Sequence, residues 1–163
     1  MGEFLSQTLA VSFPFTELTV GATNSAGSSD TVHWVSMEDY EYFLCLVEVG
    51  TWNGTDDLDT CKLEQATSSA GAGKKDLTTA ASGGNYDTDY PVDADGDQVY
   101  LECHASDLDV AGGFKYVRVY CAEVSGSGTD NVSAVYIRGR ARIKRNELNV
   151  AASSGSKVYV KPS

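Results

Sequence analysis

Two histidines and four cysteines are the side chains of this chain best suited to nucleophilic, acid–base or metal chemistry. His104 directly follows Cys103, and neighbouring residues of a strand point to opposite faces, so this pair cannot form a thiol–imidazole contact locally. His33 stands beside Trp34, and the chain has none of the sequence patterns of α/β-hydrolases, zinc proteases or nucleotide-binding loops. We therefore expect no enzymatic activity, no catalytic residue and no cofactor.

The four cysteines are widely spaced and include no Cys-x-x-Cys pair, which argues against a zinc site. Each lies in an apolar or alternating segment, and these residues are Cys45, Cys61, Cys103 and Cys121. The pattern is typical of buried free thiols that pack as small apolar side chains. Two disulfides remain the alternative if the protein works in an oxidising place.

An acidic cluster offers oxygen ligands at alternate positions, Asp93, Asp95 and Asp97, which is a pattern that suits calcium. An EF-hand loop beginning at Asp93 would require glycine at position 98 and glutamate at position 104, where this chain has Gln98 and His104. The favoured interpretation is a turn before the apolar run QVYLEC, with a structural calcium site as the weaker alternative.

The run YIRGRARIKR concentrates five of the 12 lysines and arginines of the chain, namely Arg138, Arg140, Arg142, Lys144 and Arg145. If the strand continues from Ser133 to Ile143, alternation places Arg138, Arg140, Arg142 and Lys144 on one face. The other face then carries small or apolar residues, namely Val135, Ile137, Gly139, Ala141 and Ile143. A contact with an acidic protein surface is the favoured role, because arginine pairs with carboxylates through two parallel hydrogen bonds. A solvated charged face is the alternative. Nucleic-acid binding is unfavourable, because no aromatic residues are interleaved for base stacking.

Charge is distributed very unevenly along the chain, whose formal net charge is -11. Residues 132–163 carry seven cations and one anion, whereas residues 1–131 carry five cations and 22 anions. This asymmetry predicts an electrostatic partner, which could be the acidic half of the same chain, a neighbouring copy or another macromolecule. We expect no membrane association, because no stretch approaches the roughly 20 apolar residues of a helical span. The N-terminus lacks a basic signal-peptide region, so we expect synthesis and folding in a reducing cytosol.

Period-two stretches rich in valine, tyrosine and threonine predict eight strands in an all-β fold, a β-sandwich or jelly-roll-like domain. The predicted strands are Thr8–Phe13, Thr31–Ser36, Tyr42–Val49, Asp59–Ala66, Gln98–His104, Tyr116–Val124, Ser133–Arg142 and Lys157–Val160. Residues 1–30 are predicted to be an N-terminal arm, and residues 31–163 a domain with a long loop at about 67–97 and a basic C-terminal segment. Large apolar residues in the arm are candidate anchors on a partner, or they cover an edge of their own domain: Phe4, Leu5, Leu9, Phe13 and Phe15.

The stretch from Ser36 to Arg142, about two thirds of the chain, resembles the capsid decoration (cement) proteins of tailed bacteriophages. Four segments carry the resemblance: VSMEDYEYFLCLVEVGTWNGTDD, CKLEQATSSAGAGKKDL, DGDQVYLECHASDLDVAGGFKYVRVYCAEV and NVSAVYIRGRAR. None of them is a catalytic signature. The N-terminal arm and the residues after Asn146 add nothing to the resemblance.

The resemblance implies a β-sandwich or jelly-roll-like domain on the outside of an icosahedral head. Such proteins commonly form trimers, bind after capsid expansion, clamp neighbouring units of the major capsid protein and use no cofactor. We therefore expect a virion protein at the capsid surface, made in the host cytoplasm. Two alternatives remain open: another virion part, such as a tail, fibre or minor head protein, and a carbohydrate-binding adhesive module that uses Trp34, Trp52, Tyr86 or Tyr90.

Overall fold

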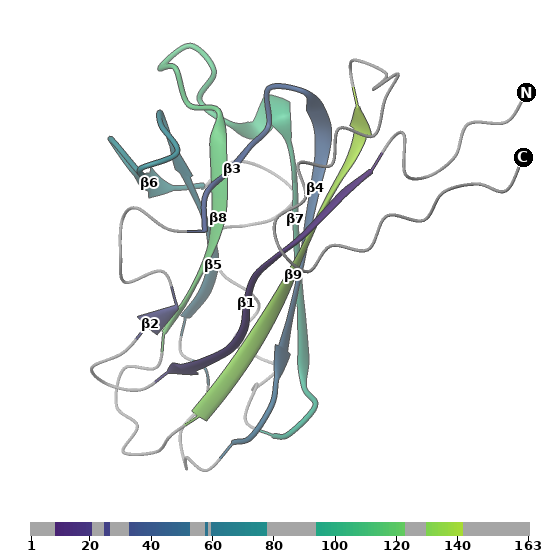
Figure 1. Ribbon diagram of the computed structural model, residues 1–163. Helices are drawn as coiled ribbons and strands as arrows, with labels where there is room; N and C mark the ends of the chain where they lie inside the picture. Colours follow the sequence, from purple (N-terminus) through teal and green to yellow (C-terminus); the bar gives the residue numbers. More distant parts are fainter. Residues whose placement is uncertain are drawn as a thin grey trace, which may run out of the picture.

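The protein is all-β, and its strands form two antiparallel sheets (Figure 1). The computed structural model describes residues 9–20, 25–26, 33–52, 58, 60–77, 94–122 and 130–141. Its strands are β1 (Ala10–Val20), β2 (Ser25–Ala26), β3 (Val35–Ser36), β4 (Tyr40–Val49), β5 (Thr60–Ala66), β6 (Lys75–Asp76), β7 (Gln98–His104), β8 (Tyr116–Ala122) and β9 (Asp130–Ala141). One turn of 3-10 helix, Ala105–Asp107, follows β7. The prediction of an all-β fold is confirmed.

The strands pair in a nested order along the chain. One sheet has the order β1-β9-β4-β7, and the other has the order β2-β8-β5-β6, with β3 also paired to β8. The first strand therefore pairs with the last, β2 and β3 pair with β8, β4 pairs with β7, and β5 pairs with β6. The chain passes from one sheet to the other between most successive strands, except from β2 to β3 and from β5 to β6. Figure 1 shows β3, β5, β6 and β8 on the left and β4, β7 and β9 on the right.

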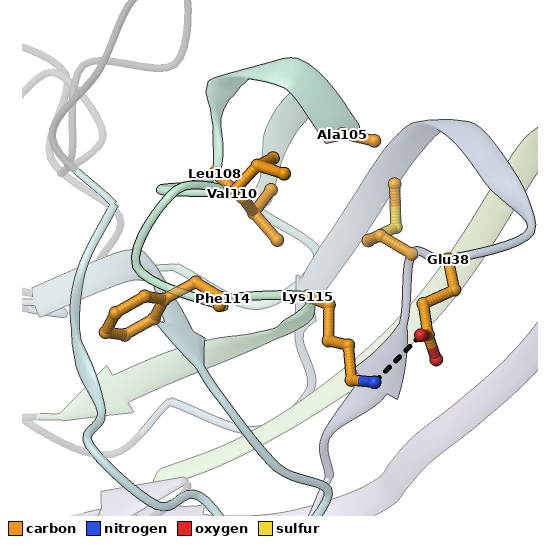
Figure 2. Close-up of a pocket in the computed structure, with 8 residues that line it drawn as sticks. Glu38, Ala105, Leu108, Val110, Phe114 and Lys115 are labelled. Atoms are coloured by element: carbon orange, nitrogen blue, oxygen red, sulfur yellow. Dashed lines mark hydrogen bonds and ion pairs between the residues drawn. The ribbon is translucent and has the colours of Figure 1, made fainter.

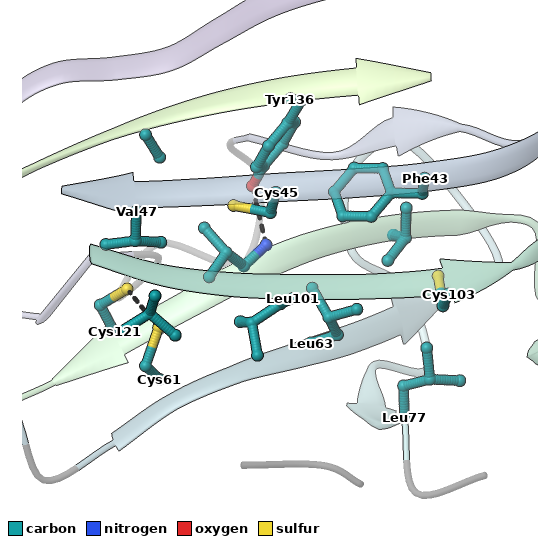
Figure 3. Packing of buried hydrophobic residues seen from close by; sticks show 14 of the residues in the cluster. Phe43, Cys45, Val47, Cys61, Leu63, Leu77, Leu101, Cys103, Cys121 and Tyr136 are labelled. Atoms are coloured by element: carbon teal, nitrogen blue, oxygen red, sulfur yellow. Dashed lines mark hydrogen bonds between the residues drawn. The ribbon is translucent and has the colours of Figure 1, made fainter. Parts of the chain in front are cut away.

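The two sheets share one apolar core, which gives a sandwich-like structure (Figure 3). Strict alternation builds its inner walls: β7 buries every second residue, as the period of two requires. Phe43 and Val47 of β4 meet Leu63 of β5 and Val119 of β8 in the same buried cluster. Burying such side chains contributes roughly 1.5–3 kcal/mol each. The core therefore positions the central strands firmly.

Strand β9 is the longest and lies between β1 and β4. Ile137 is opposite Val11 on one side and Leu44 on the other, so side chains of three strands stand in one row. Between Asp130 and Tyr136, alternate residues of β9 are buried, and the residues between them are only partly buried. This register decides which side chains leave the core.

The structure differs from the sequence prediction at the N-terminus. Residues 1–30 were predicted to be an arm, yet Ala10–Val20 form β1, the edge strand of the four-stranded sheet, and Ser25–Ala26 pair with β8. Pairing with β9 satisfies backbone groups that a detached arm would leave to water. Part of the predicted long loop is also ordered, because Lys75–Asp76 form β6 against β5. The predicted strand Lys157–Val160 lies outside the described residues.

Candidate protein-interaction face

One surface of the four-stranded sheet points away from the shared core, and we call it the outer face. Alternation and register place nine apolar or aromatic side chains on it. They are Leu9, Val11 and Phe13 at and beside β1, Val135 and Ile137 of β9, Tyr42, Leu44 and Leu46 of β4, and Tyr100 of β7. They occupy neighbouring positions on adjacent strands.

The outer face exposes far more apolar surface than an antiparallel sheet usually shows to water. Such sheets normally alternate apolar residues inside with polar residues outside. Here Phe13, Tyr100 and Val11 are 63%, 62% and 56% exposed, and Tyr42 is 38% exposed. A contiguous apolar patch of this kind typically marks a surface that another macromolecule covers.

A hollow of about 370 Å³ indents the outer face where β1, β9, β4 and β7 meet. Gly139 opens the space, because a side chain there would meet Leu9, whose Cδ2 lies 3.2 Å from an ideal Cβ position. The ring of Tyr42 lies edge-on to that of His104, with the centroids 4.3 Å apart. The hollow has an apolar floor and two polar rim residues, Glu102 and His104, a composition that suits a protein contact.

Of the predicted cationic face, only Arg138 and Arg140 are described, and Arg138 is partly buried. Arg138 shares the side of the strand that carries Tyr136, its guanidinium stacks 4.8 Å from the ring of Tyr40, and its Nη1 donates to the carbonyl of Ser36 at 2.9 Å. The outward side carries Val135, Ile137 and Gly139, which the sequence analysis had taken as the small apolar side. The sequence left open which side of β9 faces the core, and the structure turns the apolar side away from it.

Arg140 lies at the edge of the outer face. Its φ of +55° interrupts the alternation, and its side chain is 68% exposed. Nη1 lies 3.3 Å from a carboxylate oxygen of Glu41 and donates to the hydroxyl of Tyr42 at 3.1 Å. Arg140 thus pairs with a carboxylate, as predicted for the basic run, but the carboxylate belongs to its own chain. Arg142, Lys144 and Arg145 lie outside the described residues, so their role stays a prediction.

The predicted arm anchors divide into three groups. Leu9 and Phe13 are on the outer face, at the edge formed by β1. Phe15 belongs to β1 and is opposite Ala134 of β9. Phe4 and Leu5 lie outside the described residues.

The described part of the acidic cluster is a turn whose carboxylates accept backbone hydrogen bonds. Asp95 Oδ1 accepts from the amide of Trp52 at 2.7 Å, and Asp97 Oδ2 accepts from the amide of Ala94 at 3.1 Å. Gly96 has a φ of +86°, which a tight turn requires. Asp93 lies outside the described residues, and among those described no three His, Cys, Asp or Glu side chains form a group that could hold a metal.

The cysteines are buried free thiols, as the sequence predicted. Cys61 and Cys121 are directly opposite on β5 and β8, with 3.6 Å between their sulfur atoms (Figure 3). The two histidines lie in different parts of the structure. His104 is on the outer face, whereas His33 is near Arg118. Burial, and then the charge of Arg118, lower the pKa of His33.

A buried ion pair escaped the sequence analysis. Arg118 and Glu64 are opposite in register on β8 and β5, 2.7 Å apart, and the ring of Trp34 covers the guanidinium at 4.6 Å. Trp34 is only 9% exposed, so it gives no platform for a sugar ring. Trp52 is half-buried, and Tyr86 and Tyr90 lie outside the described residues. The two residues are 54 positions apart in the sequence, so no local pattern could have revealed this pair.

A second hollow, of about 210 Å³, lies between the β3–β4 turn and the loop before β8 (Figure 2). Met37, Leu108 and Phe114 line it, and Lys115 Nζ lies 2.8 Å from Glu38 Oε1 at its rim. That ion pair lowers the pKa of Glu38 and raises the pKa of Lys115. The hollow is smaller than the roughly 300–1,000 Å³ of typical small-molecule sites, so it makes a weak ligand pocket.

The outer face is therefore the strongest candidate for a functional surface. No family model, curated protein or solved structure matches this chain. Among the described residues, no helix is long and apolar enough to cross a membrane.

Proposed function

We propose that this protein is a structural component of a tailed-phage virion that decorates the exterior of the icosahedral capsid. It stabilises the capsid through contacts with the major capsid protein and with copies of itself. The observation that carries the proposal is the outer face, where Val11, Phe13 and Tyr100 are each more than half exposed. An apolar patch of this extent favours a protein that functions by covering another protein surface.

The strand order supports the same proposal. We interpret the nested pairing of β1 with β9, β4 with β7, and β5 with β6 as a jelly roll, with β2 and β3 together serving as one strand. Jelly rolls recur in viral capsid proteins, lectins and cupins. Because one fold serves many functions, the order alone does not select among them. The resemblance of residues 36–142 to decoration proteins favours the virion.

Many weak contacts suit such a role better than one tight site. A decoration protein on a capsid meets several neighbours at once, and effective concentration multiplies contacts that are individually weak. The acidic character of the chain, with a net charge of -11, also limits association in free solution through self-repulsion. We therefore propose that binding becomes strong only on the assembled particle.

Capsid binding is tested with heads from a phage whose copy of this gene is deleted. The wild-type protein should cosediment with these heads and raise the temperature at which they release DNA. The triple variant V11S, F13S and Y100S should bind at least tenfold more weakly. V110S is the matched control, because Val110 is 65% exposed and apolar but lies in the loop before β8.

Three results would count against the proposal. The first is a wild-type protein that does not cosediment with heads, and the second is equal loss of binding in V110S. The third is a count of only a few copies per particle, which would indicate a tail or fibre component. A decoration protein should instead be present in hundreds of copies.

A further inference from the structure

We propose that the outer face binds a second copy of this chain, in a two-fold pair with opposed strand directions. The inference deepens the proposed function, because it names the occupant of the face on which that function rests. The inference depends on two residues of opposite charge, which lie at opposite ends of the apolar part of the outer face. Arg140 stands at one end, and Glu48 stands at the other.

The two charged residues flank the apolar part of the face along one strand direction. Arg140 is paired with Glu41, one residue before Tyr42 on β4, whereas Glu48 lies two residues beyond Leu46. Glu48 is exposed, and its parity along β4 matches that of Tyr42, Leu44 and Leu46. At about 3.4 Å per residue, the seven residues from Glu41 to Glu48 span roughly 24 Å. The structure gives Glu48 no ion pair with another described residue.

A two-fold axis turns this arrangement into a self-complementary surface. When a second sheet faces the first with its strands reversed, Arg140 of each copy approaches Glu48 of the other. The axis then passes near Leu44, midway along the strand and close to the centre of the apolar residues. Val11 and Phe13 of the two copies pack against each other at the β1 edge. Two charge pairs therefore flank a centre that is largely apolar, with Glu102 of β7 opposite Leu44.

The size of the face predicts a modest affinity. Four strands about 4.8 Å apart, each contributing about eight residues, cover roughly 500 Å² of flat sheet. Standard interfaces bury about 800 Å² on each partner, and smaller ones belong to transient complexes. We therefore expect dissociation in the micromolar range, weakened further by salt because the charge pairs are exposed.

Charge reversal with rescue tests the inference on the purified full-length protein. Sedimentation equilibrium between about 1 and 200 µM should show a wild-type monomer–dimer equilibrium. R140E and E48R should each raise the dissociation constant at least tenfold, because like charges then meet twice. The double variant R140E/E48R should return it to within about threefold of wild type, because the pairs re-form with reversed polarity.

Matched controls keep the outcome interpretable. K115E reverses a charge that is also paired within the chain but lies in the loop before β8, and it should leave the dissociation constant unchanged. E41Q removes the partner of Arg140 within the chain and separates loss of that contact from loss of the dimer. Thermal melting of each monomer shows whether a variant is folded.

Several results would overturn the two-fold pair. One is a wild-type protein that stays monomeric at 200 µM, and another is a pair of single variants that associate like wild type. A third is a wild-type protein that forms a trimer whose assembly the double variant does not restore. Capsid binding by a protein that remains monomeric would sink this inference and leave the proposed function standing. A protein whose double variant regains dimerisation, but which never binds heads, would support this inference and contradict the proposed function.

Discussion

The hydroxyl of Tyr136 accepts a hydrogen bond from the backbone amide of Val119 at 2.7 Å, and this bond joins the two sheets inside the core (Figure 3). Tyr136 belongs to β9 and Val119 to β8, and neither is exposed. Buried amides almost always have a partner, because an unsatisfied one forfeits its hydration. Tyr136 therefore holds the strand that carries the outer face in register with the opposite sheet.

Replacing Tyr136 by phenylalanine should lower the free energy of unfolding by about 1–3 kcal/mol, because the amide of Val119 is left buried without an acceptor. Urea denaturation followed by tryptophan fluorescence measures the change. Y100F is the matched control, since Tyr100 is exposed and its hydroxyl donates to Oε1 of Gln98 at the surface. Equal stability of Y136F and Y100F would contradict the structural role of this bond.

Breaking the buried pair of Arg118 and Glu64 should be more costly than breaking an exposed one. Arg118→Met leaves a carboxylate that is 8% exposed beside an apolar side chain, and we expect a loss of roughly 3–5 kcal/mol. Lys115→Met breaks the pair with Glu38, in which both side chains are about half exposed, and should cost far less, because water screens an exposed pair. Similar losses in the two variants, measured by urea denaturation, would refute the distinction.

Alkaline pH should destabilise the fold through its buried thiols. Burial raises the pKa of Cys103 to about 12, and burial also raises the pKa of Cys45. The pKa of Cys61 is raised first by its hydrogen bond with Cys121 and then by burial. A thiol in the unfolded chain ionises near pH 8.5, so stability is complete below that pH and declines as pH rises toward the raised values.

The decline is measurable as a slope. Each of these thiols should remove about 1 kcal/mol of stability per pH unit above roughly pH 9. Urea denaturation at pH 7, 9 and 10.5 should show the loss, and C103A should show a shallower slope. A free energy of unfolding that stays constant up to pH 10.5 would contradict the burial of these groups.

The turn at Asp95 should work without a metal. D95A should destabilise the protein by about 1 kcal/mol in buffer containing EDTA, because the amide of Trp52 loses its acceptor. Adding millimolar calcium to the wild-type protein should leave its melting temperature unchanged. A calcium-dependent rise of several degrees would revive the cation-site interpretation of this cluster.

Local pattern predicted most of the strands, since seven of the nine strands among the described residues overlap a predicted one. Strands β2 and β6 were missed, because two residues are too few to show a period of two. The extent of β1 was also missed, because its register shifts twice against β9 between Ser12 and Leu18 and blurs the alternation. The pair of Arg118 and Glu64 depends on strands 54 residues apart, which no local pattern specifies.

Strand β9 separates what the sequence determined from what only the tertiary structure decided. Alternation alone showed that Val135, Ile137 and Gly139 share one side, because successive side chains of a strand point in opposite directions. It could not show which side faces the core, because both sides of β9 carry apolar residues and alternation by itself does not distinguish the two sides. The hydrogen bond between the hydroxyl of Tyr136 and the amide of Val119 places the Tyr136 side of β9 against the opposite sheet. The side that carries Val135, Ile137 and Gly139 therefore faces outward as the candidate interface.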